Sequence, residues 1–506
     1  MINCLVPAAR QQAYRWIEAQ RQLFLNDTNF LASLITSRQE ETRQFAGRLL
    51  SSSILNDDTA KVLIGQIIVQ VLTFNPEAEG IAKVVDDIAD ILLTSFSPQL
   101  RKLGMGVILD LLRHPLPEVQ KLGARILLNH ETPAAELPPE LIESLIESPY
   151  QQVRGIGIRI FGQLPDEILI NSQQLVILAM AVNSEEDIRN AIKPIIARLA
   201  AGNSEFALEL ALDLIEFLLV PEKAEGVHSY LLGLLRDDLP GWMKNIDKET
   251  AMRLCVAKSN YAKELGGLIL QENCRDWAEE FETIKIVKLA SNEILAVREA
   301  GRQMFSENIE RFRSNTQEML AAVRILESKW DDSREFAWNL FNETFTEEDW
   351  SPEVMVSICD SVRDEVRQLG RELVTRYFEE SYGQDYLLKF SEHPSGDMQM
   401  FATNFLENYA ADNPQRLREL MPYFVSVLSR VNRGGVAKRR VFSFLDKEAE
   451  KSEEAARVVA EILTRQSVTI AVGDKANAIR TMLKINRSFP EISLPIQVKP
   501  VLEVRS

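Results

Sequence analysis

Apolar residues recur along this chain at fixed distances from one basic or amide side chain. In the stretch 148–164, apolar residues lie one place before Arg154 and two, six and seven places after it, and Gly157 lies three places after it. The pattern occurs nine times, around Arg43, Arg101, Gln120, Arg154, Arg189, Arg298, Arg334, Arg367 and Gln399. The residue three places on is small in every copy except at Ile192.

These spacings place the apolar residues on one stripe of a helix, and the small residue lets a neighbouring helix approach closely. From Gln120 onward the copies are 34, 35, 109, 36, 33 and 32 residues apart, and 109 spans three units. One helix pair cannot bury such a stripe, whereas stacked pairs can. The sequence therefore predicts an all-α fold, a right-handed α-solenoid (superhelix) of about 11–13 short helix pairs.

The chain between the copies also has helical periodicity. Helices are predicted at 8–25, 38–55, 58–75 and 79–95, and weaker ones in a degenerate region at 204–219, 223–236, 247–258, 260–271 and 276–290. Ser97-Pro98, Ser148-Pro149 and Ser351-Pro352 are each expected to begin a helix, with Ser as the N-cap and Pro as the first helical residue. Prolines at 490, 495 and 500 predict an extended tail. It could pair with a strand, lead into another domain or pack along the solenoid.

The predicted organisation has four parts. They are an N-terminal helical cap at 1–36, a repeat array at 37–429 with degenerate units at 204–290, a basic C-terminal helical cap at 430–487 and the extended tail at 488–506.

The motif resembles the HEAT repeat, whose second helix opens with Pro or an acid followed by VRxxG or VRxxA. Val153-Arg154-Gly157, Val297-Arg298-Gly301 and Val366-Arg367-Gly370 match best, whereas Gln120 and Gln399 replace the Arg. The 32–36 residue spacing is shorter than the 40–47 residues usual for HEAT and armadillo units. Tetratricopeptide and ankyrin arrays have that shorter period, but their signatures are missing. The resemblance implies adaptor roles in which the chain binds another macromolecule.

Charge and composition narrow the class of protein. The formal net charge of -17 argues against a surface that binds nucleic acid or anionic membrane along its whole length. Residues 430–506 differ, with 15 Lys and Arg against 9 Asp and Glu. The four cysteines have no metal-ligand spacing and are too sparse for a disulfide framework, which favours a reducing compartment. With no leader or membrane-spanning run recognised, we expect a cytoplasmic protein with no membrane partner.

Two groups of basic residues are candidate partner-binding residues. The first group lies four or five places beyond the motif position and would form a basic stripe on the concave side if the second helices line it; the alternative is ordinary pairing along the same helices. The second surrounds the Gly434-Gly435 turn and could hold phosphate, or could be a solvated turn. The two groups are Arg48, Arg125, Arg159, Lys193, Arg302 and Arg371, and Arg430, Arg433, Lys438, Arg439 and Arg440. The motif Arg residues themselves are expected to pair with acids of neighbouring units.

Catalytic motifs are not recognised. The four histidines lack metal-ligand spacing, and Ser391-Glu392-His393 is expected to be a helix end followed by a turn. Gly155-Ile156-Gly157 and Gly473-Asp474-Lys475 depart from the nucleotide-binding fingerprints. The sequence thus predicts no catalytic residue, no cofactor and no metal.

The leading hypothesis is a non-enzymatic scaffold that recognises a protein through the concave face of the solenoid and the basic C-terminal end. A second is a nucleic-acid-binding solenoid, similar to the HEAT-like alkylpurine DNA glycosylases, with a basic groove on the phosphate backbone. A third is the helical-repeat regulatory portion of a larger enzyme. The oligomeric state is left open.

Overall fold

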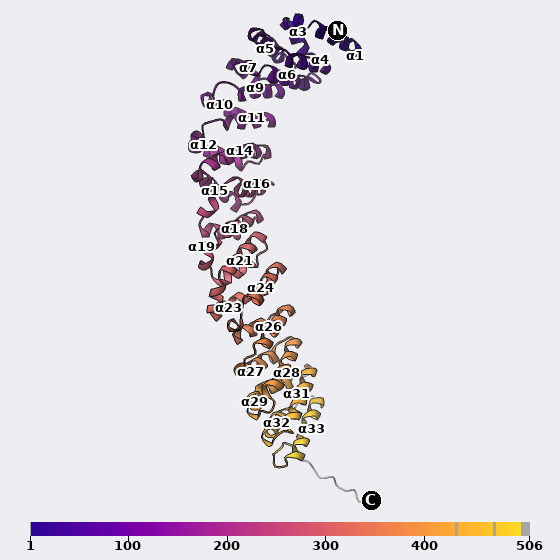
Figure 1. The fold of residues 1–506 in the computed structure, drawn as a ribbon, viewed down its shortest axis with the longest axis vertical. Coiled ribbons are helices and arrows are strands. Elements are labelled where there is room, and N and C mark those ends of the chain that lie inside the picture. Colours follow the sequence, from indigo (N-terminus) through magenta and orange to yellow (C-terminus); the bar gives the residue numbers. More distant parts are fainter. Residues whose placement is uncertain (1, 431–433, 469–471, 497–506) are drawn as a thin grey trace. The chain divides into compact units, whose positions relative to one another are not determined.

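The structure, a computed structural model, describes residues 2–430, 434–468 and 472–496. Every regular element in these ranges is helical. The chain divides into two compact units, Met1–Ile269 and Leu270–Ser506. Within each unit, helices that follow one another in sequence also pack against one another, as Figure 1 shows.

In the first unit the helices form two layers. The motif-helix layer consists of α1 (Pro7–Ala19), α4 (Glu40–Ser51), α6 (Ile81–Ser95), α9 (Pro117–Leu128), α11 (Gln151–Phe161), α14 (Glu186–Gly202) and α16 (Val227–Gly233), which continues into the π-helical η2 (Leu234–Asp238). The partner-helix layer contains α3 (Thr28–Ile35), α5 (Asp57–Leu72), α8 (Met105–Leu112), α10 (Pro139–Ile146), α12 (Asp166–Ser172), α13 (Gln174–Ala181) and α15 (Ser204–Leu219). The remaining elements are α2 (Arg21–Leu25), α7 (Ser97–Leu100), η1 (Ala134–Glu136), η3 (Trp242–Asn245), α17 (Lys248–Cys255) and α18 (Asn260–Glu272), in which the division into units falls.

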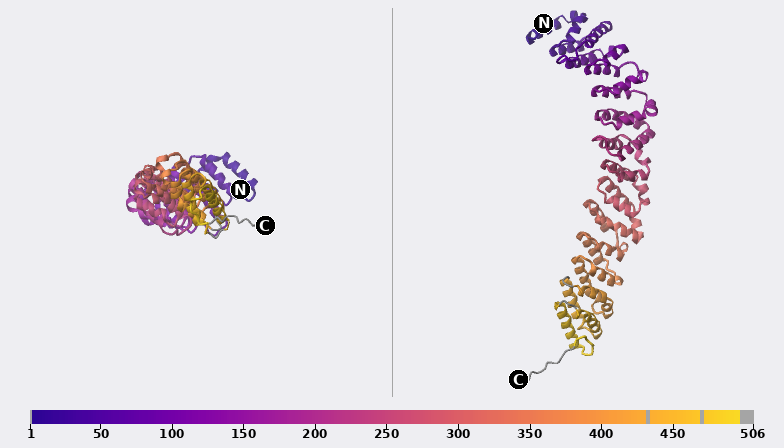
Figure 2. Two further views of the ribbon diagram at one scale, coloured as in Figure 1. Left: turned by 90° about the horizontal axis from the view of Figure 1, so that it is seen from below. Right: turned by 180° about the vertical axis from the view of Figure 1, so that it is seen from behind.

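The second unit repeats this arrangement, and the right-hand view in Figure 2 shows its helices stacked on one another. Its motif-helix layer is α21 (Leu295–Glu307), α24 (Asp331–Glu343), α26 (Asp364–Arg376), α28 (Gly396–Ala410), α31 (Gly435–Glu448) and α33 (Val472–Ser488). Its partner-helix layer is α20 (Thr283–Ala290), α23 (Thr316–Ala322), α25 (Pro352–Cys359), α27 (Gly383–Glu392), α30 (Met421–Leu428) and α32 (Glu453–Gln466). The connecting elements are α19 (Cys274–Trp277), η4 (Ala278–Glu280), α22 (Ile309–Ser314), η5 (Val323–Glu327), η6 (Glu347–Asp349), η7 (Glu380–Tyr382) and α29 (Pro414–Glu419).

The predicted fold class is confirmed, because the described chain is an all-α solenoid of short helix pairs. Among the described helices, hairpins such as α10 with α11, α20 with α21 and α25 with α26 have the most extensive contacts. The predicted helix at 204–219 matches α15. The helix predicted at 276–290 was wrong in detail, because Glu282 and Thr283 begin a new helix after a turn at Phe281.

The motif position is the Arg or Gln around which each copy of the pattern is centred. In the structure it is the fourth residue of its helix. This holds for eight of the nine copies, in α4, α9, α11, α14, α21, α24, α26 and α28. The copy at Arg101 was wrong. The helix that begins at Ser97 ends at Leu100, and Gly104 is the residue before the next helix, with open space where a Cβ would lie. Proline at its start and glycine near its end confine α7 to one turn.

Only one of the three predicted Ser-Pro helix starts has the expected geometry. The Ser351 side chain accepts a hydrogen bond from the Val354 N–H, and Pro352 is the first helical residue. α7 already includes Ser97, and α11 begins two residues after Pro149. Ser148 instead accepts a hydrogen bond from the Tyr150 N–H, which makes a turn before the helix.

A second repeated position, missed in the sequence, lies six residues before the motif position. Its side chain accepts a hydrogen bond from the N–H two residues on, and its carbonyl accepts one from the motif side chain. The eight residues are Ser37, His114, Ser148, Asn183, Asn292, Ser328, Ser361 and His393. The side chains of Ser, Asn and His each carry an acceptor atom that can reach the N–H two residues further on. Aligning the copies on the motif position would have revealed this column.

This turn makes a specific prediction at Ser361, whose hydroxyl is buried and accepts the Arg363 N–H at 3.0 Å. We expect Ser361→Ala to cost about 1 kcal/mol, because the part-buried Arg363 N–H loses its acceptor and the hydroxyl's hydrogen bond to Glu327 is lost. Ser361→Asn should cost less, since Asn183 and Asn292 make the same turn. Hydrogen exchange of α25 and α26 measures both effects. Ser306→Ala, at an exposed position, is the control, and equal effects of Ala at both positions would contradict the prediction.

The predicted extended tail is described only in part. Residues 489–496 follow α33 without further helix, and Ile492 is buried there with its N–H bonded to the Phe489 carbonyl. The three alternatives for the tail stay predictions. Residues 497–506, including Val498 and Val504, lie outside the described residues. The predicted boundaries of the two caps stay predictions.

Candidate partner-binding surface

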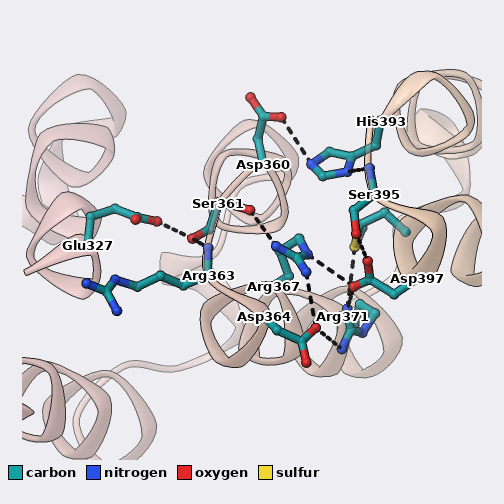
Figure 3. Close-up of polar contacts among 11 residues, drawn as sticks. Glu327, Asp360, Ser361, Arg363, Asp364, Arg367, Arg371, His393, Ser395 and Asp397 are labelled. Carbon is teal, nitrogen blue, oxygen red and sulfur yellow. Dashed lines mark hydrogen bonds and ion pairs between the residues drawn. The ribbon is translucent and has the colours of Figure 1, made fainter.

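The motif arginines are used inside the fold, and Figure 3 shows the contacts around Arg367. The guanidinium of Arg367, from α26, donates to the Ser361 carbonyl at 3.0 Å and to the Asp397 carboxylate at 3.1 Å. Arg371, one turn further along α26, contacts the same carboxylate. Asp397 is the second residue of α28. One arginine thus closes its own turn and joins its helix to the next motif helix.

We call such a cation–acid pair between two successive motif helices a rung. Rungs recur in both units and form a ladder within each. In the first unit the pairs are Arg10–Glu41 at 2.7 Å, Arg43–Asp87 at 2.6 Å and Arg154–Asp187 at 2.8 Å; in the second they are Arg298–Asp332 at 3.0 Å, Arg367–Asp397 at 3.1 Å and Lys438–Asp474 at 2.6 Å. Glu41, Asp187, Asp332 and Asp397 are each the second residue of a motif helix. The predicted pairing of motif arginines with neighbouring acids is confirmed for these rungs.

Two rungs that the sequence analysis missed belong to this ladder. Arg10 and Lys438 are the fourth residues of α1 and α31, and both are buried. Arg10 donates to the carbonyl six residues earlier, as the other motif arginines do. A basic residue three places after the proline that begins α1 was a signal for the first. No Gly or Ala follows three places after Lys438, which concealed the second.

Where the motif changes, both ends of the rung change. Gln120 and Gln399 still donate to the carbonyl six residues earlier, but the second residue of the following motif helix is Gln152 or Val436 instead of an acid. An amide can replace the turn contact of an arginine but not its charge. The covarying loss of cation and acid indicates that the two ends of the rung function as a pair.

The degenerate region begins where a rung takes another form. The following helix, α16, has Tyr230 as its fourth residue, and the guanidinium of Arg189 lies 5.6 Å from the centre of the Tyr230 ring. The Tyr230 hydroxyl donates to the Arg189 carbonyl at 2.7 Å. A cation over an aromatic ring replaces the ion pair here. This explains why the motif becomes unrecognisable after Arg189 while the helices continue.

Ionisation of the ladder acids is favoured by their partners. Burial alone would raise the pKa of Asp397, but hydrogen bonds from Ser395 and Arg367 and the charge of Arg371 hold that pKa well below its usual range. Asp332 has the same balance: burial opposes ionisation, and contacts from Arg302 and Arg298 lower its pKa overall. Both acids therefore stay charged at neutral pH.

The six residues of the predicted basic stripe divide into two groups. Four have acid partners: Arg125 with Asp90 at 2.9 Å, Lys193 with Asp238 at 3.0 Å, Arg302 with Asp332 at 2.7 Å, and Arg371 with Asp397. Arg48 and Arg159 are exposed and have no ion partner among the described residues. They lie on α4 and α11, with α6 and α9 between them in the layer. The structure therefore does not join the six into one free basic stripe.

Arg159 lies beside a shallow groove in the motif-helix layer. We call it the Arg159 groove; its volume is about 580 Å³, and its lining residues come from α9, α11 and α14: Lys121, Gln152, Gly155, Ile156, Arg159, Ala191 and Pro194. Gly155 has open space where a Cβ would lie. Lys121 is paired with Asp86 at 3.0 Å, so Arg159 supplies the free cation of this groove.

The predicted basic cluster at the C-terminal end has mixed roles. Lys438 is buried in its rung, and burial lowers the pKa of the half-buried Arg430. Arg440 is exposed and donates to Asn404 of α28 at 2.8 Å, whereas Arg439 is exposed with no ion partner in the described chain. Arg433 lies outside the described residues. As partner-binding residues, Arg439 and Arg440 stay a prediction.

The Ser391-Glu392-His393 sequence forms a helix end, as predicted. α27 ends at Glu392, Ser391 donates to the Leu388 carbonyl, and the His393 ring accepts the Ser395 N–H. In the described ranges, His, Cys, Asp and Glu side chains do not gather into a group that could hold a metal ion. Among the helices that the structure describes, none has the length and apolarity needed to cross a membrane.

Comparison with known proteins finds distant likeness of structure and no likeness of sequence. No family model matches it, and no curated protein matches it. Yeast importin-beta (Kap95p) is 11% identical, with 96% of this chain and 72% of that chain covered and a TM-score of 0.32. Kap121p is 13% identical, with 96% and 56% covered and a TM-score of 0.33. UNC-45 from Drosophila melanogaster is 12% identical, with 96% and 72% covered and a TM-score of 0.23.

With TM-scores this low, the class of this chain rests on its own helix pairs, turns and rungs. The chain is an α-solenoid of short HEAT-like repeats, in which eight of the nine recognised motif residues are the fourth residue of their helix and donate to the carbonyl of a turn residue six places earlier. The chain spans 56% of the length of Kap121p.

Proposed function

We propose that this chain is a non-enzymatic scaffold that binds a protein partner through its motif-helix layer. The observation that carries the proposal is the Arg159 groove, which crosses three successive motif helices and holds a free guanidinium beside small and apolar side chains. A surface that spans several repeats suits a macromolecular ligand, as is usual for solenoids. An arginine next to apolar surface is typical of the centre of protein interfaces.

The balance of charge favours a protein partner over nucleic acid. Binding to a phosphate backbone requires several free Lys and Arg side chains along one path. Four of the six stripe residues are instead paired with acids within the fold. An acidic side chain of a partner protein needs one free cation, and Arg159 supplies it. Arg439 and Arg440 are proposed as a second, separate contact at the C-terminal end.

The test is quantitative affinity capture with the intact chain and two double variants, Arg48→Glu with Arg159→Glu and Arg439→Glu with Arg440→Glu. We expect the first to reduce recovery of the specific partner proteins at least about tenfold, because a repulsive charge replaces an attractive one. Lys102→Glu with Lys223→Glu alters two exposed lysines elsewhere in the first unit and should leave recovery unchanged. Equal recovery by all variants would contradict the proposal.

A parallel measurement separates the nucleic-acid alternative. Fluorescence anisotropy of a labelled 30-base-pair DNA duplex is measured against the intact chain in 50 and 200 mM salt. We expect negligible binding at 200 mM. Binding that falls steeply with salt and is abolished by the Arg48→Glu, Arg159→Glu variant would favour the nucleic-acid solenoid instead.

A further inference from the structure

An apolar groove lies in the partner-helix layer of the first unit, between α10 on one side and α12 and α13 on the other. We call it the α10–α13 groove; it has a volume of about 240 Å³, and its apolar lining includes Leu137, Ile142, Ile146, Leu164, Ile168 and Val176. α13 packs against α15, whereas α10 packs less against α12 and α13. Prolines 138, 139 and 165 begin the short helices on both sides and fix these turns.

Apolar side chains at this groove are left partly in water. Ile168 and Val176 are each 38% exposed, and their neighbour Leu175 is 79% exposed. Contiguous exposed apolar residues mark interaction sites on soluble proteins. The volume is below the ~300–1,000 Å³ usual for a small-molecule site. It suits one or two apolar side chains inserted from a partner.

The helices on both sides of the groove carry acidic side chains, and one of these, Asp166 at the start of α12, is paired with Arg198 of α14 at 2.9 Å. Residues 131–148 and 164–181, which form both sides, contain seven Asp and Glu and no Lys or Arg. Glu140, Glu143 and Glu147 follow one another at helical spacing along α10, and Glu143 lines the groove itself. These three glutamates are exposed and have no cation partner among the described residues.

The spacing of these glutamates indicates the form of the occupant. Positions three and four apart lie on one face of a helix, and seven residues of helix span about 10 Å. A second helix lying along α10 would carry Lys or Arg at the same spacing, opposite the glutamates. Its apolar residues would lie on the adjacent side of that helix, facing the groove. The acidic rim would repel an anionic lipid surface or a nucleic acid.

We propose that the α10–α13 groove docks a short amphipathic helix of a partner protein, whose apolar side chains enter the groove and whose Lys and Arg side chains face Glu140, Glu143 and Glu147. The groove belongs to the other helix layer from Arg159. The proposal rests on the general scaffold function and assigns it a second surface with the opposite charge preference.

The test begins with a phage-displayed library of random 16-residue peptides, selected against the full chain in 150 mM salt. We expect enrichment of sequences with Lys or Arg three, four and seven places apart and apolar residues at helical spacing. One enriched peptide, synthesised with a fluorescent label, then serves as the probe for anisotropy. Failure to enrich any such sequence overturns the proposal.

Variants locate the probe on the chain. Glu140→Lys, Glu143→Lys and Glu147→Lys combined should weaken its binding at least about tenfold, since each exposed ion pair contributes a modest part and its reversal adds repulsion. Ile168→Asp should weaken binding as well, by introducing a charge at the apolar wall. The matched control changes three exposed glutamates of the second unit, Glu353→Lys, Glu454→Lys and Glu461→Lys, and should alter binding less than about twofold. Circular dichroism and thermal unfolding check that each variant is folded.

Three outcomes would overturn the proposal at this stage. In the first, the probe binds the groove variants as tightly as the intact chain. In the second, the control variant loses binding to the same extent as the groove variants. In the third, the groove variants change the sedimentation of the chain, which would indicate that a second copy of the chain occupies the groove. The Arg48→Glu, Arg159→Glu variant should leave probe binding unchanged. Failure of the α10–α13 groove is thereby distinguishable from failure of the scaffold proposal.

Discussion

Replacing Gly301 by alanine should destabilise the α20–α21 hairpin by about 3 kcal/mol, the upper end of the cost of overpacking a close contact. A Cβ at this position would lie 2.1 Å from the Ala290 backbone nitrogen and 2.5 Å from the Leu289 carbonyl carbon. Both are backbone atoms of the partner helix, so the two helices would have to separate. We expect faster hydrogen exchange throughout α20 and α21 and a lower thermal midpoint for the second unit.

Gly155→Ala is the matched control, because Gly155 is also inside a motif helix but has open space at the Cβ position. Alanine there should stabilise α11 by up to about 1 kcal/mol, since it removes the entropy cost of a helical glycine. Gly157→Ala, two residues on, should behave like Gly301→Ala, as its Cβ would lie 2.8 Å from the Leu145 carbonyl carbon. A neutral effect at both Gly157 and Gly301 would show that the helices do not approach as closely as described.

The second large effect is expected at Asp397, which contacts Arg367 and Arg371 at once. Asp397→Ala leaves the buried Arg367 guanidinium without its carboxylate. Removing one partner of a buried pair costs ~3–5 kcal/mol, and because the Asp397 side chain is 31% exposed we expect about 2–3 kcal/mol. Hydrogen exchange of α26 and α28 should report the loss. Asp331→Ala breaks the pair with Arg334, where the acid is 91% exposed, and should cost less than about 0.5 kcal/mol.

The same residue makes the stability of the second unit dependent on pH. The pKa of Asp397 lies below its ordinary value of 3.8 in the folded chain, so its ionised form stabilises the fold at all pH values above that. This contribution is lost as the pH falls below 3.8 toward the folded-state pKa. The unfolding free energy of the intact chain should therefore decrease in that range, and that of Asp397→Asn should decrease less. Parallel curves would contradict the assignment.

The rungs explain why a helix pair shorter than the usual HEAT unit can still be repeated regularly. Each motif arginine satisfies a turn carbonyl that no backbone N–H reaches, and most also join their helix to an acid on the following one. The turn geometry and the helix-to-helix register are thus set by one side chain. Loss of the acid alone would leave the arginine buried and unpaired, which accounts for the paired changes at Gln120 with Gln152 and at Gln399 with Val436.

Much of this arrangement was accessible from the order of the amino acids. Helical periodicity and the small residue at the third place after the motif position are local signals, and they predicted the eight motif helices and the close approach at Gly123, Gly157, Gly301 and Gly370. The motif helix predicted at Arg101 was wrong because the prediction did not consider the short distance between Pro98 and Gly104. The short distance between this helix start and Gly104 leaves room for one turn only, and α7 is four residues long.

The sequence by itself determined the all-α class, the places of most helices and the cations of four of the six rungs, since these depend on residues near one another in the chain. Only the tertiary structure decided which cations are free. Arg125, Lys193, Arg302 and Arg371 meet acids from 26 to 45 residues away, and Arg159 does not. The α10–α13 groove is likewise a property of packing, because it lies between short helices that pack little against one another. The physical reason is that contact between helices depends on their directions in space.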